Sequence, residues 1–154
     1  MPSSNEKWIV RRNHLKSSFE ALYRDVAAHF GLPPSIVWIL YTLMDAEGEL
    51  AQRNLGEEWG LPKQTVNSAI QHLNRDGCLT LAVIPGTRNR KSIHLTEQGR
   101  ALAEKTTRLL AQAEERAAAH LTEEEKRQYI ALSEKYYRAL LEETRRIRNS
   151  DREG

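Results

Sequence analysis

The sequence predicts a mainly α-helical fold with one small β-hairpin. Three observations support this fold class. Long segments near both ends repeat apolar residues at helical spacing. Residues 52–76 show the pattern of two short helices separated by a Gly-Leu-Pro break. Residues 78–95 then show two short strand patterns joined by a basic turn. Two short helices followed by a hairpin is the order found in a winged helix-turn-helix.

The first long helix is expected from about Asn5 to Phe30. Its apolar residues recur at three-, four- and seven-residue intervals, as one face of a helix requires: Trp8, Leu15, Phe19, Leu22, Val26 and Phe30. Gly31, Pro33 and Pro34 end it. A second, shorter helix should follow and stop near Gly48, with an apolar face made of Ile36, Ile39, Leu40 and Leu43.

The two central helices are short. The segment QRNLGEEW, residues 52–59, places Leu55 and Trp59 four residues apart and so on one face. The segment KQTVNSAIQHLNRD, residues 63–76, has an apolar stripe of Val66, Ile70 and Leu73. Gly77 supplies the left-handed residue that commonly ends a helix.

The opposite face of the second central helix is the strongest functional signal. It consists of polar, mostly short and uncharged side chains: Lys63, Gln64, Thr65, Asn67, Ser68, Gln71 and His72. A helix face that meets only water usually carries Glu/Lys pairs, whereas amides and hydroxyls can read the edges of DNA bases. The interpretation is a recognition helix, with a solvated face as the alternative.

A basic turn joins the two predicted strands, CLTLAVI and KSIHL. Its sequence, PGTRNRK, gathers Arg88, Arg90 and Lys91 at the hairpin tip. Guanidinium groups there can contact phosphates or enter a minor groove. The alternative is a solvated turn that protects a sheet edge from aggregation. Following a helix of recognition type, the tip is interpreted as a DNA-contacting wing.

Charge is concentrated in the same region. The whole chain carries 23 Lys+Arg against 21 Asp+Glu, a net charge of +2, which indicates nothing about nucleic acid. Residues 62–95 hold five basic residues against the single acid Asp76, a net charge of +4. A local basic patch on a nearly neutral chain favours salt-sensitive contact with phosphates.

Two further helices are predicted beyond the hairpin. Thr96 can cap one that runs through Leu102, Leu109, Leu110, Ala113 and Ala117. Thr122 and Glu125 form a T-x-x-E capping box, so the last helix begins there. Its broad stripe consists of Tyr129, Ile130, Ser133, Tyr136, Tyr137, Leu140, Leu141 and Ile147.

The long terminal helices expose more apolar surface than one small domain can cover. A second copy of the chain is the economical partner, and the alternative is a compact monomer. We therefore expect a helical dimerisation region (residues 5–32 and 97–148), a DNA-binding winged helix-turn-helix (33–96) and a frayed tail (149–154). Two recognition helices related by a two-fold axis read an inverted repeat with half-sites about 10 base pairs apart.

The central segment also carries a family resemblance. GLPKQTVNSAIQHLNRDGCL, followed by a wing and IHLTEQG, resembles the MarR (multiple antibiotic resistance regulator) family of bacterial transcription factors over roughly residues 8–147. The resemblance implies a homodimer that binds double-stranded DNA, usually as a repressor. Many members of the family release DNA in response to phenolic or other small amphipathic compounds, so a small effector of this kind is expected here. One departure concerns the wing: the family's Asp-x-Arg signature would fall on Thr87 and Asn89.

Roles follow for the individual residues. Gln64, Thr65, Asn67, Ser68 and Gln71 are expected to face bases or nearby phosphates, with His72 on the same face. Gln52, Arg53 and Lys63 are expected to contact the DNA backbone, and the wing contacts would come from Arg88, Asn89, Arg90 and Lys91. His14, Trp38 and Tyr41 are candidates for an effector site, because aromatic rings with polar groups can hold a planar acid; core packing is the alternative.

Other classes of protein find little support in the sequence. The five His residues show no metal-ligand spacing, and no phosphate loop, G-x-S-x-G or Cys-His arrangement appears, so we expect no catalytic residues, cofactor or metal. No apolar run approaches a membrane span and no signal peptide is evident, which favours a cytoplasmic protein. Cys78, the single cysteine, is expected to be a small buried apolar residue. A winged helix used only for protein interaction and, less favoured, a small enzyme remain alternatives.

Overall fold

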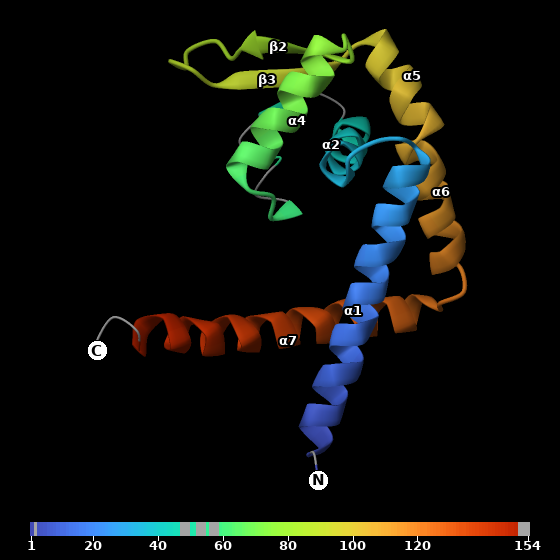
Figure 1. The fold of residues 1–154 in the computed structure, drawn as a ribbon, viewed down its shortest axis with the longest axis vertical. Helices are drawn as coiled ribbons and strands as arrows, with labels where there is room; N and C mark the ends of the chain where they lie inside the picture. The colour runs from blue at the N-terminus through green and yellow to red at the C-terminus, as the bar shows by residue number, and fades with distance from the viewer. Residues whose placement is uncertain (2, 47–49, 52–54, 56–58, 151–154) are drawn as a thin grey trace. The chain divides into compact units, whose positions relative to one another are not determined.

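The structure is a computed structural model that describes residues 1, 3–46, 50–51, 55 and 59–150 (Figure 1). The predicted fold class is confirmed: the chain is mainly helical with a small β-sheet. The chain divides into two compact units, Met1–Ala111 and Gln112–Gly154, which are described separately. The elements are α1 (Ser4–His29), α2 (Pro34–Asp45), β1 (Leu50–Ala51), α4 (Lys63–Arg75), β2 (Leu79–Val83), β3 (Lys91–Leu95), α5 (Glu97–Lys105), α6 (Thr107–Ala118) and α7 (Glu123–Ser150).

The core of the first unit lies between α2, α4 and the sheet. Its fully buried side chains come from all three parts: Ile36, Ile39 and Leu40 of α2, Ile70 and Leu73 of α4, Leu79 of β2 and Ile93 of β3, together with Leu55. Helix α4 contacts both α2 and β2, and in Figure 1 it lies beside the hairpin. This packing leaves the other face of α4 toward solvent.

The sheet has three antiparallel strands in the order β1-β3-β2. The predicted hairpin is confirmed as β2 and β3, with Leu81 paired to Ile93 and Val83 to Lys91. The sequence analysis did not predict β1, which pairs Leu50 with Ile93 and Ala51 with Ser92. Two residues are too few to show an alternating pattern, so no sequence signal marks this strand.

Gly77 ends α4 as predicted. Its φ is +70°, in the left-handed region that glycine enters without a steric penalty. The backbone N–H of Gly77 donates to the carbonyl of Asn74 at 3.0 Å, and that of Cys78 donates to the carbonyl of Leu73 at 2.8 Å. These two bonds form a Schellman motif, which fixes the path of the chain from α4 into β2.

Helix α1 has a capping box, in which the Ser3 hydroxyl accepts from the backbone N–H of Glu6 and the Glu6 carboxylate accepts from that of Ser3. Only the C-terminal end of α1 is packed: Ala27 lies in a buried cluster with Val37 of α2 and Leu110 of α6. Toward the N-terminus the predicted apolar stripe is exposed, at Trp8, Leu15, Phe19 and Leu22.

The helix expected to run from Thr96 to Ala117 is interrupted, so that prediction was wrong in one respect. Helix α5 ends at Lys105, and α6 begins at Thr107, because Thr106 leaves helical geometry at φ −130° and ψ −84°. The Thr106 hydroxyl donates to the carbonyl of Leu102 at 2.7 Å, and that of Thr107 donates to the carbonyl of Ala103 at 3.1 Å. Hydroxyls that bond back into the preceding turn bend helices, and the apolar pattern does not register this effect.

Helix α7 makes up most of the second unit and begins where the capping box predicted. The Thr122 hydroxyl accepts from the backbone N–H of Glu125 at 3.2 Å, and the Glu125 carboxylate accepts from that of Thr122 at 2.7 Å. This bond to the Thr122 backbone holds the pKa of Glu125 below its usual value. The large apolar side chains of the predicted stripe are exposed within the chain, among them Tyr129, Ile130, Tyr137, Leu140 and Ile147.

Candidate nucleic-acid interface

The two faces of α4 differ as the sequence predicted. Val66, Ala69, Ile70 and Leu73 are buried in the core. The polar face lies on the other side, with Lys63, Gln64, Ser68 and Gln71 exposed and Thr65, Asn67 and His72 half-buried. The structure therefore presents amide, hydroxyl and imidazole groups on one side of a helix of 13 residues, which is the form in which a helix can meet base edges.

The N-terminal end of α4 is electropositive. Its N-cap is Pro62, no side chain caps the free backbone N–H groups, and the first turn has no acidic residue. Lys63 instead adds a positive charge where the helix dipole already favours negative ones. This arrangement is unfavourable for an isolated helix but suits contact with a phosphate.

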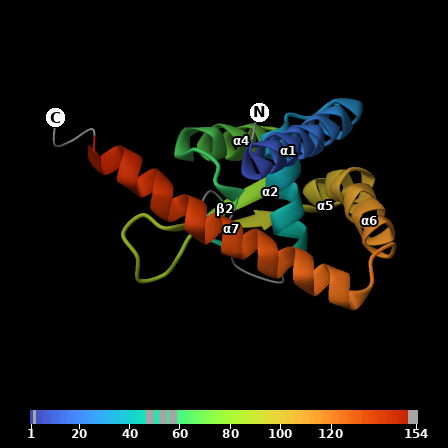
Figure 2. The ribbon, with the colours of Figure 1, turned by 90° about the horizontal axis from the view of Figure 1, so that it is seen from below.

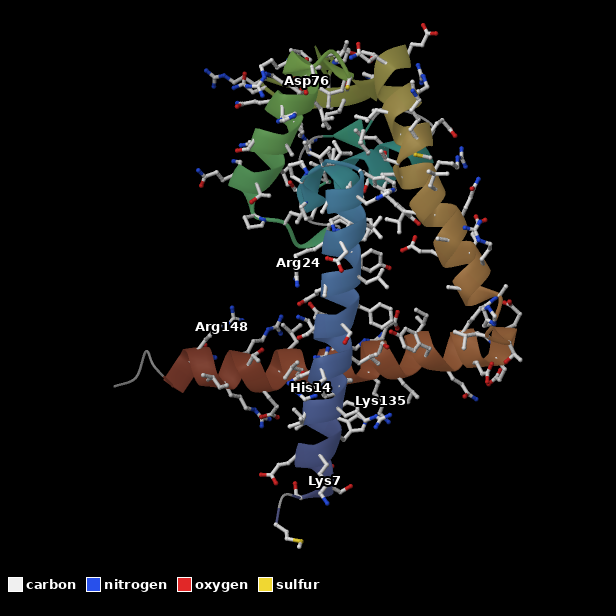
Figure 3. All side chains as sticks on the ribbon, turned by 45° about the vertical axis from the view of Figure 1, so that its right-hand side comes forward. Lys7, His14, Arg24, Asp76, Lys135 and Arg148 are labelled. Carbon is white, nitrogen blue, oxygen red and sulfur yellow. The ribbon has the colours of Figure 1, made fainter. Side chains whose placement is uncertain are left out.

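The C-terminal end of α4 is neutralised within the chain. The Asp76 carboxylate lies 3.1 Å from Nε2 of His72 and 3.8 Å from Nε of Arg75. Figure 3 labels Asp76 at this end of the helix. Arg75 and Asp76, which both count toward the local charge of the region, thus offset each other, and the remaining positive charges of the region are those of Lys63 and the wing.

The wing is a compact turn between β2 and β3. The backbone N–H of Ile84 donates to the carbonyl of Arg90 at 2.8 Å, which continues the hairpin beyond the strands. Both the backbone N–H and the hydroxyl of Thr87 donate to the carbonyl of Ile84, at 3.2 Å and 2.8 Å. The side chains beyond this turn are exposed: Arg88, Asn89, Arg90 and Lys91.

Thr87 explains how the wing holds its shape where the family's signature would place an aspartate. Its hydroxyl stabilises the turn by donating to the carbonyl of Ile84. Within the described residues, no ion pair joins Arg88, Arg90 or Lys91 to an acidic side chain. Two predicted backbone contacts, Gln52 and Arg53, lie outside the described residues.

The structure groups two of the three candidate effector residues. Trp38 and Tyr41 of α2 lie with Tyr23 of α1 and with Trp59 in one aromatic cluster. The rings of Trp38 and Trp59 stack with centroids 4.7 Å apart, and Tyr23 meets the edge of Trp38 at 4.9 Å. The indole N–H of Trp59 donates to the hydroxyl of Thr42. The rings contact one another and so fill much of the space between them.

His14 does not join this cluster. It lies nine residues before Tyr23 on α1, roughly 13 Å along the helix axis at 1.5 Å per residue. Its neighbours are Glu6, Lys7, Val10 and Arg11 along a shallow exposed surface of α1, and Figure 3 labels it in the N-terminal half of the helix. The sequence analysis placed Trp59 on the apolar face of a predicted helix and gave Tyr23 no role, because nothing local indicates that two residues so far apart in the chain share one cluster.

The structure gives further information on metals, membranes and Cys78. Among the described residues, no group of three or more His, Cys, Asp or Glu side chains is arranged to hold a metal ion. No single described helix has the length and apolar composition of a membrane span; only the pair Ser4–His29 and Pro34–Met44, bent by 87°, reaches them together.

Cys78 is buried, as predicted, and burial, with a smaller contribution from Asp76, raises the pKa of its thiol.

Comparison with known proteins gives one family match and several similar structures. Residues 30–88 match the model of the MarR family. The structure is similar to NMB1585, a MarR family regulator from Neisseria meningitidis, with a TM-score of 0.74 and 23% identity over 92% of this chain and 96% of that one. It is also similar to MepR of S. aureus in a complex with DNA, with a TM-score of 0.73 and 21% identity over 90% and 99% of the two chains.

A third similar structure is the PcaV transcriptional regulator from Streptomyces coelicolor in complex with its natural ligand, with a TM-score of 0.62 and 21% identity over 83% and 92% of the two chains. A search of curated proteins gave no match. These structures share the winged helix-turn-helix fold with this chain. The family match covers residues 30–88, which lie within the segment that carries the resemblance stated from the sequence.

Proposed function

We propose that this protein is a dimeric, sequence-specific DNA-binding regulator of transcription, acting as a repressor in the cytoplasm on an inverted repeat. The observation that carries the proposal is the combination of the exposed polar face of α4, the uncapped N-terminus of that helix at Lys63, and the exposed cations of the wing. Amides and hydroxyls on α4 supply base contacts, while Lys63, Arg88 and Arg90 supply phosphate contacts. DNA is also what MepR of S. aureus binds in its complex.

Dimerisation is supported by the exposed apolar residues of the two terminal helices. Trp8, Leu15 and Phe19 of α1 are about half exposed, as are Tyr129 and Ile130 of α7. Monomeric proteins rarely expose large contiguous apolar patches, and both helices repeat such exposed side chains at helical spacing. A second copy of the chain buries these stripes and brings two copies of α4 into one assembly, which is what an inverted repeat requires.

An effector site is proposed at the aromatic cluster of Tyr23, Trp38, Tyr41 and Trp59. The cluster joins α1 of the proposed dimerisation region to α2 of the winged domain. A planar amphipathic compound that separates these rings changes the placement of α2, and with it the DNA-binding arrangement. Such a compound is expected to quench the fluorescence of the stacked Trp38–Trp59 pair in a saturable titration. Trp38→Phe should weaken its binding. If no phenolic acid of a panel quenches this fluorescence, the proposed effector site is wrong.

The alternative is a winged helix that binds only other proteins. It has no need of the cations at Lys63, Arg88 and Arg90, and its affinity for a partner is not expected to fall with salt in the manner of phosphate contact. The unfavourable position of Lys63 at the start of α4 favours DNA binding over this alternative.

The proposal is tested by selecting binding sites from random duplex DNA at about physiological salt. The wild-type protein is compared with the double variant Arg88→Ala/Arg90→Ala, and Lys135→Ala, which removes one positive charge from α7, serves as a control. Enrichment of an inverted repeat with half-sites about 10 base pairs apart, weakened in the wing variant alone, supports the proposal. Absence of an enriched motif with the wild-type protein, with and without phenolic acids, contradicts it.

A further inference from the structure

Three successive backbone carbonyls, those of Asp76, Gly77 and Cys78, are bonded to the start of α5. The side-chain amide of Gln98 donates to the Asp76 carbonyl at 3.0 Å. The Thr96 hydroxyl donates to the Gly77 carbonyl at 2.6 Å. The backbone N–H of Thr96 donates to the Cys78 carbonyl at 3.1 Å. The turn that leaves α4 is therefore held by α5 at every carbonyl; we call this set of contacts, residues 76–78 with 96–99, the α4–α5 joint.

The joint is also closely packed. A Cβ atom at Gly99 would lie 1.8 Å from the carbonyl oxygen of Cys78, so only glycine permits α5 to approach the turn this closely. Gly99 itself is buried, and its backbone N–H donates to the Thr96 hydroxyl at 3.1 Å. One hydroxyl thus accepts a bond that caps α5 and donates a bond to the turn after α4.

The α4 side of the joint is rigid for separate reasons. The Schellman bonds from Gly77 and Cys78 tie the turn to the last residues of α4. The Asp76 carboxylate is held by His72 of the same helix. A displacement of α5 that carries the turn with it is therefore passed to α4 as a whole.

We propose that Thr96 and Gln98 are positioning residues that set the direction of α4 relative to α5, and through it the half-site spacing that the dimer prefers. The second part rests on the proposed function, because it requires two copies of α4 on one DNA duplex. The chain runs from α5 through α6 into α7, and these three helices belong to the proposed dimerisation region. The joint therefore connects this region to α4 both through the chain itself and through hydrogen bonds.

Substitutions at Thr96 separate a positioning role from helix capping. Thr96→Ser keeps both functions of the hydroxyl. Thr96→Asp keeps an acceptor that caps α5 well, but an ionised carboxylate has no proton to donate to the Gly77 carbonyl. If Thr96 only caps α5, the serine and aspartate variants should behave alike. If Thr96 also positions α4, only the aspartate variant should lose the preference for one half-site spacing. Gln98→Glu likewise removes a donor at an exposed residue, with Gln112→Glu on α6 as its matched control.

The first readout is the affinity for duplexes that carry identical half-sites at centre-to-centre spacings that vary one base pair at a time. Wild type, Thr96→Ser and Gln112→Glu are expected to prefer one spacing. In Thr96→Asp and Gln98→Glu, the ratio of the affinity at the preferred spacing to the affinity at neighbouring spacings falls by about fivefold, the factor that corresponds to one neutral hydrogen bond. The base preference within each half-site is retained. A loss of folding stability alone lowers affinity at all spacings equally.

The second readout needs no DNA. Spin labels at Ser68→Cys on α4 and Ala101→Cys on α5, in labelled chains diluted with unlabelled ones, report the distance between the two helices; both sites are exposed and the native Cys78 is buried. A narrow distribution in wild type and Thr96→Ser that broadens in Thr96→Asp supports the joint, even if no DNA site is selected and the proposed function fails. Equal distributions in all variants, or an unchanged spacing preference in Thr96→Asp, overturn it.

Discussion

Gly99 lies directly against the backbone carbonyl of Cys78, at a distance that leaves no room for a side chain: an added Cβ would sit 1.8 Å from the oxygen. We predict that Gly99→Ala destabilises the protein by about 2–3 kcal/mol, since the atom it meets belongs to the backbone and cannot rotate away. Chemical denaturation followed by circular dichroism measures this loss. The loss should appear as a lower midpoint of unfolding.

Gly77→Ala is the control for this prediction. Gly77 has a positive φ of +70°, but the nearest atom to an added Cβ is the end of the Gln98 side chain at 3.4 Å. Its replacement therefore costs about 1 kcal/mol of backbone strain and little steric clash. If Gly99→Ala proves no more destabilising than Gly77→Ala, the close approach of α5 to Cys78 is not what requires the glycine.

The Cys78 thiol should be unreactive in the folded protein. Burial, and to a lesser degree the charge of Asp76, raises its pKa, so the reactive thiolate is scarce at neutral pH. We expect slow labelling by an aromatic disulfide at pH 8 and complete labelling in denaturant. Rapid, stoichiometric labelling of the native protein would contradict the buried placement.

The same pKa shift has a consequence for stability. A group whose pKa is raised on folding contributes stability that is fully present below its unfolded value, about 8.5 for a thiol, and that is lost as the pH rises toward the folded value. Unfolding midpoints measured between pH 7 and 10 should therefore fall more steeply for wild type than for Cys78→Ala. Parallel curves would show that Cys78 does not titrate differently in the two states.

Lys63 should contribute affinity without sequence preference. It stands at the uncapped end of α4, where a phosphate is the natural partner. We predict that Lys63→Ala weakens binding to all DNA sequences by a similar factor and lowers the slope of log K against log salt by about 0.9 per chain in contact. Fluorescence anisotropy at several salt concentrations measures both. A changed base preference with an unchanged slope would assign Lys63 to base contact instead.

The apolar stripe of α7 should hold the dimer. Tyr137 and Leu140 are exposed within the chain at 63% and 40% of their surface. Replacing both with glutamate places charges in the proposed interface and should give monomers in sedimentation velocity, with the helical circular dichroism of the winged unit retained. Lys135→Glu, an exposed change on the same helix, is the control and should remain dimeric. If the wild-type protein sediments as a monomer, the proposed dimer is wrong.

Local sequence signals predicted most of the winged unit. Val66, Ile70 and Leu73 repeat at helical spacing, Gly77 marks the end of α4, and a β-branched run follows at once, so periodicity and turn chemistry agree. The capping box at Thr122 likewise located the start of α7. These features depend on residues close together in the chain, which sequence analysis can evaluate.

Features that depend on distant residues could not be predicted. Thr106 and Thr107 are buried at the break between α5 and α6, where the Thr107 hydroxyl lies 2.9 Å from Sδ of Met44 on α2, while the apolar pattern continues through the break. The stacking of Trp38 on Trp59 joins residues 21 positions apart, and the bonds of Thr96 and Gln98 to the turn after α4 join residues about as distant. In each case tertiary packing decides the role of a residue, and the residues next to it in the sequence give no sign of that role.

The most direct test of whether the polar face of α4 reads DNA bases is to compare the DNA sites selected by wild type and by Gln71→Ala. Gln71 is exposed on the polar face of α4, two turns from its start, and an amide there discriminates between bases by about 1–3 kcal/mol. We predict an inverted repeat for both proteins, with base preference lost at one position in each half-site for the variant. An identical motif for both, or equal weakening for every sequence, would contradict a reading role for α4.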